Sequence, residues 1–457
     1  MSINETREIA MRKGTGLLAL MAVGGALALP GAASAETQMD AMQRQIEELQ
    51  RQLLDLKAKQ AQTEQRQVET EKRQETALTE DDLKGTMPGS IRIPGTNTSL
   101  KIGGYVKLDG IYDLGPSMGG TVTADSMPLD GDRRREGAFG YNVRQTRLNV
   151  TTETPFEDIK VRSVLEFDFY GGGGNEANVN SATPRLRHAY VTAGPFLVGQ
   201  TWSTAYDLAA AGEKLDFGGL PGEQAVRQPQ VRYTSVSGPD TFAIALENPE
   251  SDFIGNVPAN NSVTAAAGSA SGIADPNFDQ VPDLVIRYAH KFDWGHLAVL
   301  GIGRQITAET VTADESVFGY GLGLSGTVKF FEKDVFGFQV LGGEGINRYL
   351  NLAYRQSASF DGSSLEALTS WGGNVSVKHY WADTMRSTLI FAYQRIDNND
   401  VVPLTANKEL MTFHANFIAT VVPSLDVGLE YIHAHRETEA GAEGSADRLQ
   451  ASVIYNF

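Results

Sequence analysis

The sequence contains no cysteine in its 457 residues. This absence excludes a disulfide scaffold, a thiolate zinc site, an iron–sulfur cluster and a cysteine nucleophile. Positive charge is also scarce: 39 lysines and arginines against 56 aspartates and glutamates give a formal net charge of −17, so nucleic acid is not an expected partner. A mean hydropathy of −0.24 argues against a polytopic helical membrane protein. Glycine, in contrast, is abundant, with 48 residues, about half as much again as the usual ~7%.

The one strongly apolar helical run near the N-terminus spans residues 16–29. Arg12 and Lys13 precede it, and Ala33-Ser34-Ala35 follow it. The run is shorter than the ~18 residues that a transmembrane helix requires, and its flanks are typical of a secretory signal peptide. We therefore predict that residues 1–35 form a signal peptide cleaved after Ala35. A membrane anchor at the N-terminus is the alternative.

Residues 36–84 contain neither glycine nor proline and are rich in Gln, Glu, Lys, Arg and Leu. Two interlocking series repeat every seven residues, which is the a and d pattern of a coiled coil. The series are Met39, Ile46, Leu53, Gln60, Gln67, Gln74 and Met42, Leu49, Leu56, Thr63, Thr70, Ala77. The pattern predicts a coiled-coil stalk, and the a and d residues leave open whether it has two or three strands. Because the second half of the seam is polar, a solvated and partly frayed helix is the alternative.

Residues 85–457 alternate apolar and polar side chains in segments of about ten residues, which predicts β-strands with one polar face. A soluble sandwich and a membrane barrel both alternate in this way. A barrel is favoured by the length of the segment, by aromatic residues at strand ends, and by short turns that alternate with long loops. The sixteen expected strands are 100–113, 139–152, 159–170, 184–194, 196–203, 229–237, 240–248, 282–292, 296–308, 318–332, 335–345, 370–382, 385–396, 409–422, 424–436 and 446–457. Residues 346–369 have no assigned place.

The predicted fold class is therefore an all-β transmembrane barrel of about 16 antiparallel strands, preceded by a helical coiled-coil segment. A barrel of this width cannot be filled by its own wall side chains and should enclose water. Paired glycines such as Gly103-Gly104 and Gly372-Gly373 fall inside or at the rims of strands. Small residues there allow a bent wall and the close approach of an infolded loop.

If the apolar faces contact lipid, a set of cations points into the lumen, and further charged residues lie in the loop that follows the fifth strand. The candidate pore-lining cations are Arg147, Lys160, Arg162, Arg185, Arg187, Arg227, Arg232, Arg287 and Lys291. The candidate constriction residues are Asp207, Glu213, Lys214 and Asp216. Guanidinium groups can pass a carboxylate along a wall without fully dehydrating it. In a regular strand Arg144 would lie on the same face as apolar Leu148, so it reaches the lumen only if a bulge intervenes.

Two alternatives stay open for these residues. The arginines could pair with Glu166, Asp168 and Glu247 as part of the wall structure, because lumenal charge networks are common in polar pore interiors. The loop over residues 204–228 could fold inward and set a transverse field, since charge at a constriction sets selectivity, or it could lie outside as an ordinary exposed loop.

Motifs for enzymatic chemistry are weak. The segment Gly321-Leu-Gly-Leu-Ser-Gly326 matches the dinucleotide fingerprint but lies inside an alternating strand and not at a strand-to-helix turn. His433 and His435 share a face with apolar residues, which favours an interfacial pair over a metal site. No cofactor, metal or catalytic residue is expected.

Four segments in a fixed order carry a family resemblance. After the signal peptide and stalk come Leu-Lys-Ile-Gly-Gly-Tyr-Val-Lys-Leu-Asp at 100–109, Gly-Gln-Thr-Trp-Ser at 199–203, Arg-Gln-Pro-Gln-Val-Arg-Tyr at 227–233 and a terminal Tyr-Asn-Phe. Together they resemble the DcaP-like family of trimeric outer-membrane porins over essentially the whole mature chain. The resemblance implies a sixteen-stranded homotrimeric channel for small anionic solutes, with the fifth loop folded inward and Phe457 recognised by the assembly machinery.

The resulting hypothesis is a diffusion porin for small anions such as dicarboxylates in the outer membrane of a Gram-negative bacterium. Its partners would be two further copies of the chain, outer-membrane lipid and lipopolysaccharide, and its stalk would lie in the periplasm. The competing hypotheses are a structural tether whose stalk does the work and a barrel enzyme of the lipase type.

Overall fold

The computed structural model describes residues 35–75, 83–131, 136–172, 179–255, 279–309, 314–350 and 356–457. The chain divides into two compact units, one up to Thr79 and one from Glu80. The predicted signal peptide falls on residues that, apart from Ala35, lie outside the described part of the chain. Among the described residues, no helix is both long and apolar enough to span a membrane.

The described residues of the first unit form one helix, α1, over Ala35–Glu75. The absence of glycine and proline allows an uninterrupted run of this length. The first half of its heptad seam is solvent-exposed in the single chain, including Met39, Ile46 and Leu53. The helix is therefore observed, and the coiled coil, which needs partner helices, stays a prediction.

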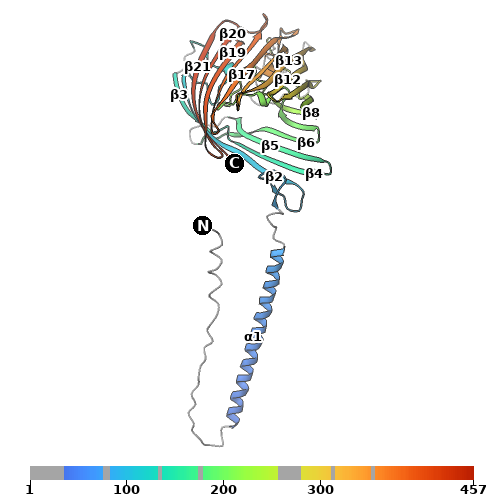
Figure 1. Ribbon diagram of the computed structural model, residues 1–457, viewed down its shortest axis with the longest axis vertical. Coiled ribbons are helices and arrows are strands. Elements are labelled where there is room, and N and C mark those ends of the chain that lie inside the picture. The colour runs from blue at the N-terminus through green and yellow to red at the C-terminus, as the bar shows by residue number, and fades with distance from the viewer. Residues whose placement is uncertain are drawn as a thin grey trace. The chain divides into compact units, whose positions relative to one another are not determined.

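The second unit is a closed antiparallel β-barrel with sixteen wall strands (Figure 1). Its strands are β2 (Ser99–Pro116), β3 (Glu136–Asn142) with β4 (Arg147–Phe156), β5 (Ile159–Gly172), β6 (Thr183–Ala193), β7 (Phe196–Trp202), β8 (Arg227–Ser237), β9 (Asp240–Glu247), β11 (Asp283–Phe292), β12 (Gly295–Glu309), β13 (Asp314–Phe330), β14 (Asp334–Glu344), β17 (Thr369–Ala382), β18 (Met385–Asp397), β19 (Asn407–Val422), β20 (Leu425–Thr438) and β21 (Glu443–Asn456). A two-residue strand, β1 (Ile91–Arg92), adds to the edge of β2. The barrel closes where β2 pairs with β21. The predicted sixteen strands are confirmed.

The second wall strand is interrupted. Both β3 and β4 pair with β2, and residues 143–146 between them leave the ladder. This break supplies the bulge on which the orientation of Arg144 depended. The Arg144 guanidinium lies 4.8 Å from the centroid of the Tyr170 ring and donates hydrogen bonds to the carbonyl oxygens of Phe169 and Gly172.

The two faces of the wall differ as the alternation predicts. On β2, Val106, Leu108 and Tyr112 are exposed on the outside, while Lys107 and Asp109 are buried inside. An outward apolar face with a polar interior is the arrangement of membrane barrels. Because lumenal segments cover the inner face, many inward polar side chains are also shielded from solvent.

Part of the lumen is filled by four inward segments. One is the loop of residues 203–226 after β7, which includes the short helix η2 (Leu208–Ala210). The second is η3 (Asn347–Leu350). The third is a small sheet of β10 (Phe253–Gly255), β15 (Ala358–Phe360) and β16 (Leu365–Ala367). These elements account for most of the described residues in the unassigned range 346–369. The fourth is the segment of residues 117–130, which includes the short helix η1 (Ala124–Ser126) and packs against the inner faces of β18–β21.

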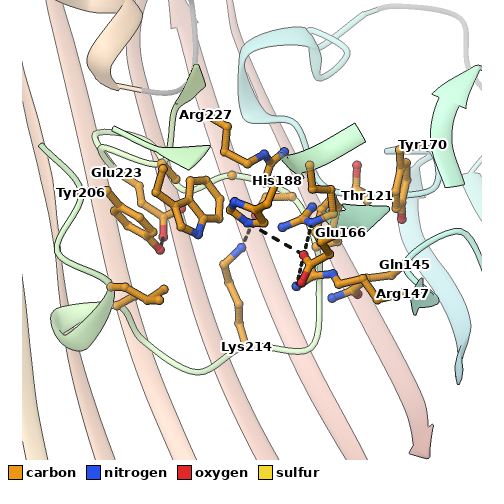
Figure 2. A pocket seen from close by; sticks show the side chains of 18 of the residues that line it. Thr121, Gln145, Arg147, Glu166, Tyr170, His188, Tyr206, Lys214, Glu223 and Arg227 are labelled. Atoms are coloured by element: carbon orange, nitrogen blue, oxygen red, sulfur yellow. Dashed lines mark hydrogen bonds and ion pairs between the residues drawn. The ribbon is translucent and has the colours of Figure 1, made fainter. Parts of the chain in front are cut away.

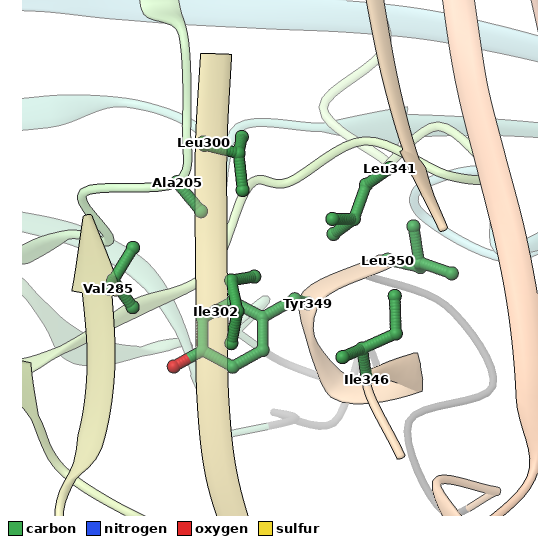
Figure 3. Close-up of a cluster of buried hydrophobic side chains, with 8 residues drawn as sticks. All are labelled: Ala205, Val285, Leu300, Ile302, Leu341, Ile346, Tyr349 and Leu350. Atoms are coloured by element: carbon green, nitrogen blue, oxygen red, sulfur yellow. The ribbon is translucent and has the colours of Figure 1, made fainter. Parts of the chain in front are cut away.

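The inner faces of β11, β12 and β14 are apolar where these segments cover them. Figure 3 shows the main cluster, whose members are Ala205, Val285, Leu300, Ile302, Leu341, Ile346, Tyr349 and Leu350. A second cluster joins Ile306 and Ala308 of β12 to Phe253, Ala358, Phe360 and Leu365. At these two clusters the barrel sector of β11–β14 is therefore packed like a protein core.

Glycine permits the contact between the loop and the wall. A Cβ at Gly337 on β14 would lie 2.7 Å from the Ala210 carbonyl oxygen, too close for any side chain. Gly222 has φ +71°, and a Cβ there would lie 2.1 Å from the Gly373 nitrogen of β17. At these positions the glycine excess serves the close approach of an infolded loop.

Candidate functional site: a basic cavity beside an infolded loop

The loop of residues 203–226 crosses the lumen and is fixed to the opposite wall. Glu213 forms ion pairs with Lys378 on β17 and Arg386 on β18, each with an N···O distance of 2.8 Å. Arg386 holds both carboxylate oxygens, which makes the contact a bidentate pair. Burial alone would raise the pKa of Glu213, but the hydrogen bonds from Arg386 and Lys378 lower it.

The next turn of the loop is held by its backbone. The N–H groups of Leu215 and Asp216 donate to the Glu430 carboxylate on β20, at 2.6 and 3.1 Å. The Asp216 side chain forms an ion pair of 3.3 Å with Arg448 on β21. A buried carboxylate that accepts two consecutive backbone N–H groups fixes the chain direction at this point.

The start of the loop is anchored on a third part of the wall. Asp207 forms an ion pair with Arg287 on β11 at 2.8 Å and accepts hydrogen bonds from His296 and Ser325, both at 2.7 Å. Burial by itself would raise the pKa of Asp207, but the His296 hydrogen bond and the Arg287 charge lower it to about 2. The carboxylate therefore stays charged at all ordinary pH values.

These contacts change the picture that the loop sequence alone suggested. The three acids Asp207, Glu213 and Asp216 are each neutralised by cations of β11, β17, β18 and β21. These three acids therefore anchor the loop to the wall. Because their charges are paired, they contribute little to an electric field across the lumen. Lys214 differs from them: its Nζ donates to the carbonyl oxygens of Asp216 and Gly218 of its own loop, no described carboxylate forms an ion pair with it, and it lines the cavity described next.

A cavity of about 1010 Å³ lies between this loop and the inner faces of β4–β8 (Figure 2). Its wall side carries Arg147, Arg185, Arg187 and Arg227, and its loop side carries Lys214, Phe217 and Tyr206. Four of the nine predicted pore-lining cations thus come together, although they lie on three different strands.

Two carboxylates of β5 hold three of the arginines in place. Arg185 donates from Nε and Nη2 to the two oxygens of Asp168, at 3.0 and 2.7 Å. Arg187 bridges Asp168 at 2.7 Å and Glu166 at 2.8 Å, and Arg147 lies 3.5 Å from Glu166. These three arginines therefore do pair with acids of the wall, as one of the two alternatives proposed. The pairing balances part of their charge, because two carboxylates meet three guanidinium groups here.

Arg227, at the start of β8, is held differently. Its guanidinium lies 4.5 Å from the centroid of the Trp202 ring, and no described carboxylate forms an ion pair with it. The arginine cluster of Arg147, Arg185, Arg187 and Arg227 has four positive charges against the two of Glu166 and Asp168, an excess of two within the cluster. The arginine cluster therefore carries a net positive charge, although the formal net charge of the whole chain is −17. Lys214 and the acids Asp125, Glu213, Asp216 and Glu223 line other parts of the same cavity.

The other five predicted cations lie elsewhere. Arg287 is bound to Asp207, and Arg232 lies on the inner face of β8 with its Nε buried and without a described hydrogen-bond partner. Lys160 lies 3.5 Å from Glu153 with its side chain 68% exposed, and Arg162 and Lys291 are exposed. All three of these exposed cations lie near strand ends that adjoin short turns.

Several buried charges were missed by the sequence prediction. Arg448 is fully buried and bound to Asp113, and buried Lys107 lies 3.2 Å from Asp109. Both cations alternate with outward apolar residues, so the parity rule that identified the other cations would have found them too. Arg304 of β12 was likewise missed, since its role depends on the inner sheet.

Arg304 is the centre of the charge network in the filled sector. Its Nη1 donates to Asp252 at 3.0 Å and to the Gly345 carbonyl at 3.1 Å, and its Nε lies 3.6 Å from Asp283. The Asp283 carboxylate also accepts the Tyr349 hydroxyl of η3 at 2.8 Å. One buried guanidinium thus connects the barrel wall with both segments that fill this sector.

Comparison with solved structures supports the fold. The outer membrane channel DcaP of Acinetobacter baumannii superposes with a TM-score of 0.69 at 22% identity, covering 81% of this chain and 100% of that chain. An anion-selective porin from Comamonas acidovorans gives a TM-score of 0.50 at 9% identity, covering 79% and 100%. At these identities the likeness concerns the barrel fold alone. No curated protein shows significant similarity to this chain.

The family assignment comes from the sequence match. The DcaP outer membrane protein family matches residues 26–457, which include α1 and the entire barrel. The match agrees with the resemblance carried by the ordered segments from residue 100 to the C-terminus. The chain therefore belongs to the DcaP outer membrane protein family, and its barrel shares the fold of the solved DcaP structure.

Proposed function

We propose that this protein is a passive channel for small anionic solutes such as dicarboxylates, driven only by their concentration gradient and without a cofactor. The observation that supports it best is Arg227, a cavity-lining guanidinium without a described carboxylate partner beside Arg147, Arg185 and Arg187. An anion that enters the cavity meets a guanidinium that forms no ion pair with a carboxylate of the described residues. Planar guanidinium groups suit carboxylates because they offer two parallel N–H donors.

The remaining arginines give the cavity its field. Their carboxylate partners neutralise only part of their charge, so an anion is attracted along the β4–β8 wall and a cation is repelled. The apolar filling of the β11–β14 sector leaves this wall as the route that water and solute would take. The Comamonas acidovorans porin, which shares the fold, is described as anion-selective, and this agrees with the proposal.

Reconstitution into planar bilayers tests the proposal. We expect stepwise conductance, a reversal potential that indicates anion preference in a KCl gradient, and partial block of the chloride current by succinate. Arg227→Gln should reduce the anion preference severalfold. Lys291→Gln, which removes one positive charge outside the cavity, is the matched control and should leave the preference unchanged. Absence of channels, or a cation preference in the unmodified protein, would refute the proposal.

We propose further that three copies assemble and that the heptad seam of α1 forms a three-stranded coiled coil in the periplasm. The support is the exposed apolar seam of the single helix, which needs partner helices to be buried. Outer-membrane lipid and lipopolysaccharide would surround the barrel. Sedimentation in detergent should give a trimer. Deletion of residues 36–84 should leave conduction intact, whereas a tether would lose its phenotype while its barrel stayed folded.

A further inference from the structure

The arginine cluster contains an aromatic ring at its centre. The Phe217 ring centroid lies 5.1 Å from the guanidinium carbon of Arg187, 5.6 Å from that of Arg185 and 5.7 Å from that of Arg147. All three distances fall within the ~6 Å over which a cation is attracted to an aromatic face. One uncharged side chain therefore contacts three cations that repel one another.

Phe217 is not a wall residue: it belongs to the infolded loop. Its ring stacks on Tyr170 of β5, with 4.9 Å between centroids and 13° between planes. The Tyr170 hydroxyl accepts a hydrogen bond of 2.8 Å from Asn142. The ring is thus supported from behind by a residue that is itself fixed.

The backbone on both sides of Phe217 is held independently of the arginines. The Asp216 N–H donates to Glu430 on β20, and the Gly218 N–H donates to the Asp216 carboxylate at 2.6 Å. The position of the ring therefore follows the position of the loop. The three guanidinium groups gather on a surface that the loop presents to them.

The chemistry of the ring explains why an aromatic residue suits this place. A further carboxylate would hold the arginines equally well but would cancel one positive charge, which removes half of the local excess of two. An aromatic face attracts cations through its quadrupole and carries no net charge. The cluster is thereby kept together without loss of positive potential in the cavity.

We infer that Phe217 is a positioning residue for anion selectivity: it holds the guanidinium groups of Arg147, Arg185 and Arg187 at the cavity surface and links their geometry to the infolded loop. The inference rests on the proposed function, since it assumes that these arginines act on permeating anions. It extends that function by assigning part of the selectivity to an uncharged residue of the loop.

The test compares two substitutions in the full-length protein in planar bilayers. Phe217→Leu keeps apolar bulk but removes the ring, and Phe217→Tyr keeps the ring. We expect Phe217→Leu to lower the anion-to-cation permeability ratio about two- to fivefold, with a smaller change in single-channel conductance, and Phe217→Tyr to restore the ratio. Phe242→Leu, the same change on the outer face of β9, is the control and should have no effect.

Each outcome has a defined meaning. A ratio in Phe217→Leu equal to that of the unmodified protein, or an equal fall in Phe217→Tyr, overturns the positioning role. An unmodified protein without anion preference overturns the proposed function itself, so the two failures are distinguishable. Heat-modifiable mobility in SDS gels confirms for each variant that the barrel is folded, so a changed ratio reports the site.

Discussion

Arg448 and Asp113 form a buried bidentate ion pair across the seam at which the last barrel strand meets the first. The Nε–Oδ1 distance is 2.7 Å and the Nη2–Oδ2 distance is 3.1 Å, between residues 335 positions apart in the chain. The same guanidinium reaches Asp216 of the infolded loop at 3.3 Å. A single side chain thus joins barrel closure to the placement of the loop.

Removal of this guanidinium should weaken the closed barrel. Arg448→Met leaves Asp113 and Asp216 buried without their cation, and loss of one partner of a buried pair costs about 3–5 kcal/mol. Urea unfolding in detergent, followed by heat-modifiable mobility, should show a lower midpoint. Adding Asp113→Asn should recover part of the loss. A double variant that is less stable than Arg448→Met contradicts the pairing.

The Glu213 anchor predicts an effect on conduction. Glu213→Gln removes the carboxylate that Lys378 and Arg386 share on the far wall and releases the middle of the loop. We expect a noisier open channel and a stronger anion preference, because Lys378 loses its carboxylate and Arg386 keeps only Asp426. Arg386→Gln should give the same noise with a weaker preference. Quiet channels in both variants would show that the loop is held without this pair.

The Asp207 anchor predicts a defined pH dependence. With its pKa lowered to about 2, Asp207 contributes about 2 kcal/mol of stability above pH 4, and this contribution is lost as the pH falls toward 2. Open-channel noise should therefore be the same at pH 7 and pH 4. Asp207→Asn should be noisy at both values. If the unmodified protein becomes noisy between pH 6 and pH 4 while Asp207→Asn does not, the role of the charged Asp207 carboxylate as an anchor is contradicted.

The Arg304 network predicts that a mutation can open the filled β11–β14 sector to permeating ions. Arg304→Met leaves Asp252 without its buried cation and Asp283 with Arg348 alone, which should loosen β10, β15 and β16 from the wall. We expect larger and more variable conductance with reduced anion preference, since the opened sector carries acids. Combining Arg304→Met with Asp252→Asn should lessen the effect. Unchanged conductance in Arg304→Met would show that apolar packing alone holds the filling.

The wall was predictable from the sequence because each strand is long enough to show its period of two. Leu148 and Val150 alternate with polar neighbours, as do Leu449 and Val453 at the other end of the chain. The inner sheet was not predictable for the same reason. Strands of three residues, such as Ala358–Phe360, are too short to show any period, and their burial comes from contact with β12.

The site was predictable in its residue types and less so in its pairings. Parity placed Arg185 and Arg187 on the inner face, and the infolded loop followed from the family resemblance. The partners of Glu213 and Asp216 lie about 165 to 230 positions further along the chain, as the separations of 173 and 232 residues to Arg386 and Arg448 show. A local sequence pattern cannot identify partners that lie so far apart in the chain. The role of Phe217 depends on ring contacts with three strands and has no sequence signature.

The apolar filling of the β11–β14 sector has an electrostatic consequence. Buried aliphatic side chains are poorly polarisable compared with water, so they screen the arginine charges weakly. Field lines from the basic cluster are then concentrated in the remaining aqueous part of the lumen. A few guanidinium groups can in this way influence permeating ions more strongly than they would in a wide, water-filled barrel of the same strand number.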